Sequence, residues 1–188
     1  ARSKGGFFTS STEPIMIGQI QIVNVKDPQR TRMTILDARE EILKKANEQD
    51  PMLVSAGGGA KDLQVKTIDT MIGPMVIAEL LVDCRDAMGA NAVNTMAEAV
   101  APMIERIIRG TVFLRIVSNL ATKRLAQART VVSKEALGGE EIVDGILEAY
   151  AFAEADPYRA ATHNKGILNG ITAVVIATCN DHRAVEAG

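Results

Sequence analysis

With 188 residues and a mass of 20.1 kDa, the chain is long enough to bury a sizeable core in one domain or in two small interleaved ones. A hydrophobic fraction of 47% excludes wholesale disorder, and a balance of 21 basic and 23 acidic residues excludes a general nucleic-acid-coating role, leaving only a local basic patch open. The most apolar run, Ile171–Cys179, is much shorter than the roughly 20 residues that a membrane helix needs, so we expect a soluble protein without a membrane span or anchor.

The two cysteines, Cys84 and Cys179, lie far apart and form no CxxC motif. This spacing speaks against a zinc module and against a disulfide scaffold, so no metal site is expected. The cysteine pattern fits a reducing cytoplasm, where we expect the protein to be found.

The first half of the chain begins with turn and strand patterns. The stretch Thr9–Pro14 predicts a turn, and the β-rich run that follows, Ile15–Val25, predicts the first strand. Apolar residues at helical spacing over 34–49 predict an amphipathic helix, with Thr34 as its N-cap.

Next come the remaining elements of one small domain. The glycine run Gly57–Gly59 predicts a loop, and the segments Leu63–Thr67 and Met75–Val82 predict a β-hairpin. Ala87–Ile108 predicts a largely buried helix and Thr111–Val117 a final strand. The resulting order, β-α-β-β-α-β, is typical of the ferredoxin-like fold, in which two helices pack on one face of a four-stranded antiparallel sheet.

Beyond Asn119 the pattern changes, and a second domain is expected. Leu120–Gln127 predicts a short helix, Ala128–Val132 a strand, and Glu140–Ala153 a longer helix. A further helix is predicted from Pro157 to Cys179, because proline suits the first turn of a helix.

A strand-to-helix junction at Asp83–Asn91 is the first candidate site. Its helix begins with small residues, so backbone N–H groups and the positive end of the helix dipole can meet a phosphate or a ribose. The alternative is that Asp86 is a simple N-cap. The run Gly57–Gly59 offers close backbone approach to a ligand or is only a flexible connection. Neither GxGxxG nor a GxxxxGKS-type motif occurs, so the usual nucleotide fingerprints are absent.

Arg159, His163, Lys165 and Asn169 form a second candidate group, and Asp181 follows in the next segment. Helical geometry places Lys165 and Asn169 on one face and Arg159 and His163 on another, so periodicity alone does not assemble a site. A lysine near an apolar core with an aspartate nearby can stabilise an oxyanion, and a solvated surface charge is the alternative.

These same segments carry a resemblance to a known family. Asp86–Asn91 with Asn94–Glu98 resembles the cofactor motif of 3-hydroxy-3-methylglutaryl-coenzyme A reductases, and Asp156–Gly166 and Asn180–Gly188 resemble the bacterial and archaeal class II form. The similarity extends over essentially the whole chain. It implies an NAD(P)H-dependent oxidoreductase of the mevalonate pathway of isoprenoid synthesis. That reaction is the reductive deacylation of 3-hydroxy-3-methylglutaryl-coenzyme A to mevalonate and coenzyme A, consuming two reduced nicotinamides, or the reverse.

The resemblance also implies an α+β domain organisation. A ferredoxin-like, NAD(P)-binding small domain over residues 14–118 is expected to be inserted in a helix-rich α/β, substrate-binding large domain. Residues 1–13 and 119–188 are expected to belong to that large domain, which is only partly present.

Roles carry over from the family by position. Lys165 resembles the catalytic lysine that stabilises the oxyanion, and Asp181 resembles the aspartate hydrogen-bonded to it. Arg159 and Asn169 match positions that bind the substrate. Dinucleotide-contacting positions correspond to Asp86, Met88, Asn91 and Asn119.

Cofactor preference is read from Asp50, which falls where NADH-preferring members carry an aspartate. A carboxylate there accepts hydrogen bonds from ribose hydroxyls and repels a 2′-phosphate, so we expect NADH rather than NADPH. The alternative, NADPH, has support in the basic residues on or near the neighbouring helix, namely Arg30, Arg32, Lys44 and Lys45.

Family members also need an upstream glutamate and a histidine in a mobile C-terminal segment, and His163 and His182 lie in the wrong motifs to replace that histidine. We therefore expect these 188 residues alone to be inactive. Because the family builds its sites at a dimer interface, a homodimer or larger homo-oligomer is expected. The alternative is a non-catalytic module that binds a nucleotide or coenzyme A.

Overall fold

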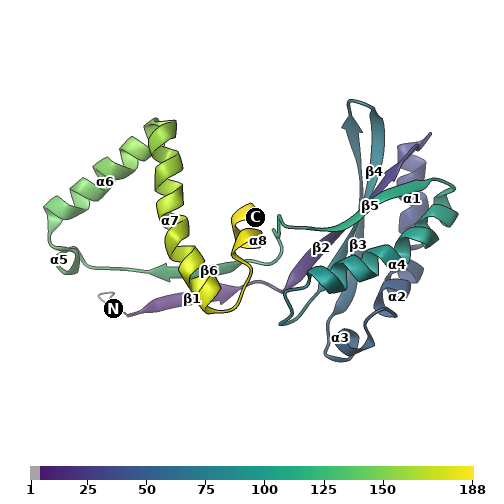
Figure 1. Cartoon of the computed structure of the whole chain (residues 1–188), viewed down its shortest axis with the longest axis horizontal. Coiled ribbons are helices and arrows are strands. Elements are labelled where there is room, and N and C mark those ends of the chain that lie inside the picture. The colour runs from purple at the N-terminus through teal and green to yellow at the C-terminus, as the bar shows by residue number, and fades with distance from the viewer. Residues whose placement is uncertain (1–4) are drawn as a thin grey trace. The chain divides into compact units, whose positions relative to one another are not determined.

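The computed structural model describes residues 5–188, which form two compact units (Figure 1). One unit is the continuous segment Thr12–Leu125. The other combines the N-terminal segment ending at Ser11 with Ala126–Gly188. The small domain expected over 14–118 falls inside the first unit, which also includes residues 12–13 and 119–125.

A four-stranded antiparallel sheet forms the base of the first unit. Its strands are β2 (Ile15–Val23), β3 (Gly59–Thr70), β4 (Gly73–Asp83) and β5 (Thr111–Ser118), in the spatial order β3-β4-β2-β5. Its helices are α1 (Pro28–Asp37), α2 (Arg39–Asn47), α3 (Pro51–Ser55) and α4 (Ala90–Ile108). With α1 to α3 as one connection, the order is β-α-β-β-α-β, which confirms the prediction and gives the split βαβ arrangement.

The apolar core lies between this sheet and its helices. Alternate side chains of each strand point toward the helices, as the period of two requires. The largest completely buried side chains in the core are Ile20, Ile22, Val76 and Leu80 on strands and Ile35, Ile42, Met96 and Ile104 on helices. Helix α4 packs closely on β2 at Gly18, where a Cβ would lie 2.7 Å from Val93 Cγ1.

The helix predicted over 34–49 starts earlier and is divided into α1 and α2. Asp27 is the N-cap of α1, because its Oδ1 accepts a hydrogen bond of 3.0 Å from Arg30 N, and Pro28 fills the first helical position. The prediction of Thr34 as N-cap is therefore wrong. Thr34 lies inside α1, where its hydroxyl donates to Arg30 O at 2.9 Å.

Helix α3 is not predicted from the sequence. Asp50 caps it, with Oδ1 accepting from Leu53 N at 2.9 Å, and Pro51 occupies its first position. The glycine run then leads into β3. Gly59, with φ at +92°, is already the first residue of β3. The loop therefore ends at Gly58, one residue before the end of the predicted loop Gly57–Gly59.

In the second unit, two strands pair over a long sequence separation. β1 (Phe7–Ser11) is antiparallel to β6 (Ala126–Thr130). The turn predicted over Thr9–Pro14 is therefore wrong at its start, and the short helix predicted over Leu120–Gln127 is not formed. Pairing with β1 decides the conformation of β6, and such a distant partner overrides local propensity.

Four helices follow the strands: α5 (Lys134–Leu137), α6 (Glu140–Ala155), α7 (Pro157–Ala177) and α8 (His182–Ala187). The two long helices confirm the predicted ones to within two residues at each end. Asp156 ends α6 and caps α7, accepting a hydrogen bond from Tyr158 N at 3.2 Å, and Pro157 takes the first position. Among residues 5–188, no helix has the combined length and apolar character that crossing a membrane requires.

Candidate functional sites

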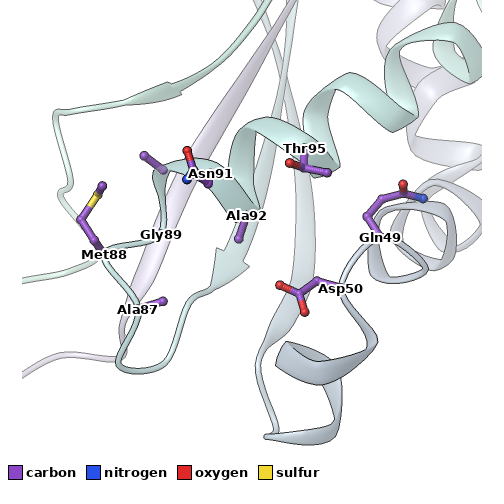
Figure 2. Close-up of a pocket in the computed structure, with 9 residues that line it drawn as sticks. Gln49, Asp50, Ala87, Met88, Gly89, Asn91, Ala92 and Thr95 are labelled. Atoms are coloured by element: carbon purple, nitrogen blue, oxygen red, sulfur yellow. The ribbon is translucent and has the colours of Figure 1, made fainter.

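The first candidate site is a hollow of about 430 Å³ in the unit that contains the sheet. One wall is the junction between α2 and α3, and the other is the loop before α4 with the first turns of that helix (Figure 2). The lining residues are Gln49, Asp50, Ala87, Met88, Gly89, Ala90, Asn91, Ala92 and Thr95. The hollow therefore collects residues from two distant parts of the sequence.

Helix α4 begins without a capping side chain. Its N-cap is Gly89, in the left-handed region with φ at +100°, and no acidic residue lies in the first turn. Asp86 is exposed and does not cap this helix, so the interpretation of Asp86 as a simple N-cap is wrong. The first backbone N–H groups and the positive end of the dipole are thus available to an anionic or polar ligand.

Limited space, as well as the left-handed backbone conformation, favours glycine at position 89. A Cβ there would lie 2.6 Å from Cys84 Sγ, and Cys84 is completely buried. Burial raises the pKa of the Cys84 thiol to about 11, although the nearby Arg124 cation acts in the opposite direction. Cys84 therefore packs beneath the loop as a small protonated thiol rather than as a nucleophile.

Asp50 lies on the wall opposite the start of α4 (Figure 2). It is half-buried, and one of its oxygens, Oδ1, is used to cap α3. A carboxylate has room for further hydrogen bonds, so Asp50 can still accept from hydroxyl groups of a ligand.

Three of the five predicted dinucleotide-contacting residues, Asp50, Met88 and Asn91, line this hollow together. Asp86 lies in the adjoining loop and Asn119 follows β5, and neither lines it. Gln49 and Thr95 also line the hollow and are not predicted. The available signals were the adjacency of Gln49 to Asp50 and the spacing of Thr95 four residues after Asn91.

The second candidate site is a hollow of about 390 Å³ between α7 and α8. Its lining residues are Ala161, Asn164, Lys165, Leu168, Asn169, Thr172, His182 and Glu186. Lys165 Nζ donates to Asn169 Oδ1 at 2.8 Å, which agrees with the prediction that these two side chains share one helix face. The hollow therefore carries an exposed ammonium group with an amide as its hydrogen-bond partner.

Asp181 and Arg159 are placed differently from Lys165. Asp181 is the N-cap of α8 and accepts hydrogen bonds from Ala184 N at 3.3 Å and Arg183 N at 2.9 Å. These backbone hydrogen bonds lower the pKa of the Asp181 carboxyl. Arg159 lies in the first turn of α7. Neither Asp181 nor Arg159 lines the second hollow.

His182 and Glu186 are site residues that the sequence does not predict. They lie one helical turn apart on α8, and both face the second hollow. The signal that could have found them is their i, i+4 spacing directly after Asp181, the same spacing that joins Lys165 and Asn169.

The chain therefore carries two hollows, one beside the uncapped start of α4 in the sheet unit and one lined by Lys165 in the helical unit. A family model described as hydroxymethylglutaryl-coenzyme A reductase matches residues 1–188. The chain belongs to the hydroxymethylglutaryl-coenzyme A reductase family.

Two curated relatives show how much of such a protein this chain represents. It is 58% identical to the 3-hydroxy-3-methylglutaryl-coenzyme A reductase of Archaeoglobus fulgidus over 188 residues, all of this chain and 43% of that protein. It is 34% identical to the probable 3-hydroxy-3-methylglutaryl-coenzyme A reductase of Borreliella burgdorferi over 186 residues, 93% of this chain and 41% of that protein. The chain thus spans less than half the length of these relatives.

Solved structures agree with the fold. A 3-hydroxy-3-methylglutaryl-coenzyme A reductase of Streptococcus pneumoniae matches with a TM-score of 0.91 and 43% identity, covering 98% of this chain and 51% of the solved one. A structure of the class II reductase from the same organism, described as bound to NADPH in open conformations, also matches with a TM-score of 0.91 and 43% identity. That match covers 98% of this chain and 45% of the solved one.

Proposed function

We propose that this chain is part of an oxidoreductase that converts 3-hydroxy-3-methylglutaryl-coenzyme A to mevalonate and coenzyme A with two NAD(P)H, or runs the reverse reaction. One observation carries the proposal. In a chain of this family, the segment Ala87–Asn91 lines a hollow at an uncapped helix start, opposite Asp50. In that reading, residues 14–118 form the cofactor-binding domain, and 1–13 with 119–188 belong to the substrate-binding domain.

The first hollow suits a nicotinamide dinucleotide. Free N–H groups at the start of α4 are donors for its phosphates, and Asn91 is a further polar partner. Asp86, Met88 and Asn119 are proposed as additional contacts around this hollow. When bound, the reduced dinucleotide would supply the electrons of the reaction.

NADH is the proposed cofactor. The support is Asp50, whose carboxylate would accept from ribose hydroxyls and repel a 2′-phosphate. None of the four basic residues that favour NADPH lines the hollow, and two of them have other partners. Arg32 Nε donates to Val65 O at 2.9 Å, and Lys45 pairs with Glu48 at 3.2 Å.

The second hollow is the proposed substrate site. Lys165 would donate to the thioester oxygen and stabilise the negative charge that develops on it, a contribution that grows when water is excluded. Asn169 holds the lysine ammonium at 2.8 Å and would also contact the substrate. Arg159 is proposed to bind the substrate carboxylate, and Asp181 to tune the proton affinity of Lys165.

Two further proposals concern the cellular location of the protein and its assembly into oligomers. A cytoplasmic location is supported by Cys84 and Cys179, which are both free thiols in the structure. Assembly into a homodimer or larger oligomer is proposed because members of the family build their sites at a dimer interface.

The test is thioester-dependent oxidation of NADH, and separately of NADPH, by the intact protein that contains this chain. Lys165→Ala is expected to lower turnover at least about a hundredfold. Lys134→Ala is the matched control, because Lys134 is also exposed but pairs with Glu140 on α5 and α6. Dinucleotide binding without any thioester-dependent oxidation would reject the enzyme and favour a non-catalytic binding module.

A further inference from the structure

Arg124 makes an unusual set of hydrogen bonds to the loop before α4. Its Nη1 donates to Met88 O at 3.1 Å, and its Nη2 donates to Ala87 O at 2.9 Å and to Arg85 O at 3.4 Å. All three acceptors are main-chain carbonyl groups of the loop that lines the first hollow. The planar fork of a guanidinium can serve several acceptors in one fixed geometry, which an ammonium does less well.

Thr12 fixes the main chain on both sides of Arg124. Thr12 Oγ1 donates to Lys123 O at 3.0 Å and accepts from Leu125 N at 2.8 Å, and Thr12 N donates to Leu125 O at 3.0 Å. The guanidinium therefore projects from the segment Lys123–Leu125, which is hydrogen-bonded to Thr12, three residues before β2. This arrangement gives Arg124 a rigid base from which to hold the loop.

Holding these carbonyl groups also orients the N–H groups of the loop. The C=O and N–H of a planar trans peptide point in opposite directions. With the Ala87 and Met88 carbonyls turned toward Arg124, the N–H groups of Met88 and Gly89 are turned away from it. Both residues line the hollow.

We propose that Arg124 is a positioning residue for the cofactor site, which holds the Arg85–Met88 loop so that the start of α4 stays open to a dinucleotide. This inference rests on the proposed function, since it takes the first hollow to bind NAD(P)H. Arg124 does not line the hollow, so it acts through the loop and not by touching the ligand.

The experiment compares three variants of the intact protein. Arg124→Gln removes both the charge and the fork, and Arg124→Lys keeps the charge. Arg115→Gln removes another arginine from the same unit, one that bridges β5 to Glu98 of α4 at 2.6 Å and makes no bond to the loop. Binding of NADH is measured by its fluorescence, and the KM for NADH and the kcat are measured separately.

A second readout reports on the loop itself. Cys84 is buried directly beneath Gly89, so alkylation of the Cys84 peptide, followed by mass spectrometry, measures how often the loop opens. Arg124→Gln is expected to speed this alkylation about tenfold, because loss of loop contacts raises the population of locally open states.

Arg124→Gln is expected to weaken NADH binding about tenfold and to raise the KM for NADH far more than it lowers kcat. Arg124→Lys should recover part of the NADH affinity and part of the protection of Cys84. Arg115→Gln should leave NADH binding and the rate of Cys84 alkylation within about twofold of the wild type. Equal effects of Arg124→Gln and Arg115→Gln, or normal NADH binding in Arg124→Gln, would overturn the inference.

If Arg124→Gln does not fold, Arg124→Lys decides: NADH binding and Cys84 protection that match the wild type would overturn the role of Arg124. A wild-type protein that binds neither NADH nor NADPH would reject the proposed function and with it this role. Normal dinucleotide binding in the wild type and in Arg124→Gln would reject the role of Arg124 alone.

Discussion

The side chain of Asn47 and the main chain of Ala60 are joined by two reciprocal hydrogen bonds. Asn47 Nδ2 donates to Ala60 O at 3.1 Å, and Ala60 N donates to Asn47 Oδ1 at 2.7 Å. They tie the end of α2 to the start of β3. The segment between these two residues carries Asp50, so this clamp also fixes one wall of the first hollow.

We predict that Asn47→Ala destabilises the protein by about 1–3 kcal/mol, because both groups of the buried Ala60 main chain lose their side-chain partner. Ser55→Ala is the control. It removes an exposed hydroxyl that donates to Met52 O at 2.8 Å within the same segment, and about 0.5 kcal/mol or less is expected. Urea unfolding of the intact protein measures both. Equal losses of stability in the two variants would contradict a stabilising role for the hydrogen bonds between Asn47 and Ala60.

A second prediction concerns the contact between Gly18 of β2 and Val93 of α4. An added Cβ at Gly18 would lie 2.7 Å from Val93 Cγ1, and the branched valine has few rotamers with which to retreat. Gly18→Ala is therefore expected to cost about 1–3 kcal/mol. In a Val93→Ala background, the cost of Gly18→Ala should largely disappear. Additive losses in this double-mutant cycle, followed by thermal unfolding, would show that α4 does not pack on Gly18.

Much of the sheet unit is predictable because its signals are local. Leu63–Thr67 and Met75–Val82 alternate along single strands, and α4 carries its apolar stripe within one helix. The pairing of β1 with β6 is not local, since the whole segment 12–125 separates Phe7–Ser11 from Ala126–Thr130 in the sequence. A sequence window contains one partner at a time, so the second half of β1, Thr9–Ser11, is predicted as a turn.

Prediction of the candidate sites is limited in the same way, because a contact between distant segments is not visible in one sequence window. Lys165 and Asn169 are predicted together because a helix places i and i+4 on one face, and the structure gives them a hydrogen bond of 2.8 Å. Gln49 and Thr95 come from elements that meet only in the folded unit. Asp27-Pro28 and Asp50-Pro51 are both helix starts in the structure, yet each reads equally well as the end of an extended segment.

A third prediction concerns acid stability and Glu79 on β4. Burial disfavours the charged carboxylate, but hydrogen bonds from Lys66 Nζ at 2.6 Å and Gln19 Nε2 at 2.9 Å outweigh it, so the pKa of Glu79 lies below its ordinary 4.5. The unfolded chain therefore binds more protons in this range. The stabilisation is present above pH 4.5 and is lost as the pH falls through the lowered pKa of the folded protein.

Glu79→Gln is expected to be less stable than the wild type by roughly 1 kcal/mol at neutral pH, and the difference should shrink as acid is added. Glu140→Gln is the matched control, because Glu140 pairs with Lys134 at the same 2.6 Å but is 74% exposed. Urea unfolding at neutral pH and near pH 4 tests both variants. A pH-independent difference for Glu79→Gln would mean that its charge does not stabilise the sheet.

The last prediction compares two helix caps of the same design. Asp27 and Asp50 each precede a proline, and each accepts one backbone hydrogen bond through Oδ1, at 3.0 Å from Arg30 N and 2.9 Å from Leu53 N. Only Asp50 lines the first hollow. Asparagine is as good an N-cap as aspartate, so Asp→Asn keeps the cap and removes the charge.

If Asp50 selects NADH as proposed, Asp50→Asn is expected to lower the ratio of kcat/KM for NADH to kcat/KM for NADPH about tenfold, because the carboxylate no longer repels a 2′-phosphate. Asp27→Asn should leave the preference unchanged, and both variants should unfold within about 0.5 kcal/mol of the wild type. The kcat/KM for each dinucleotide, measured in the intact protein, gives the ratio. An unchanged ratio in Asp50→Asn would remove Asp50 as the selecting residue. An equal shift in Asp27→Asn would trace the effect to the helix caps rather than to the hollow.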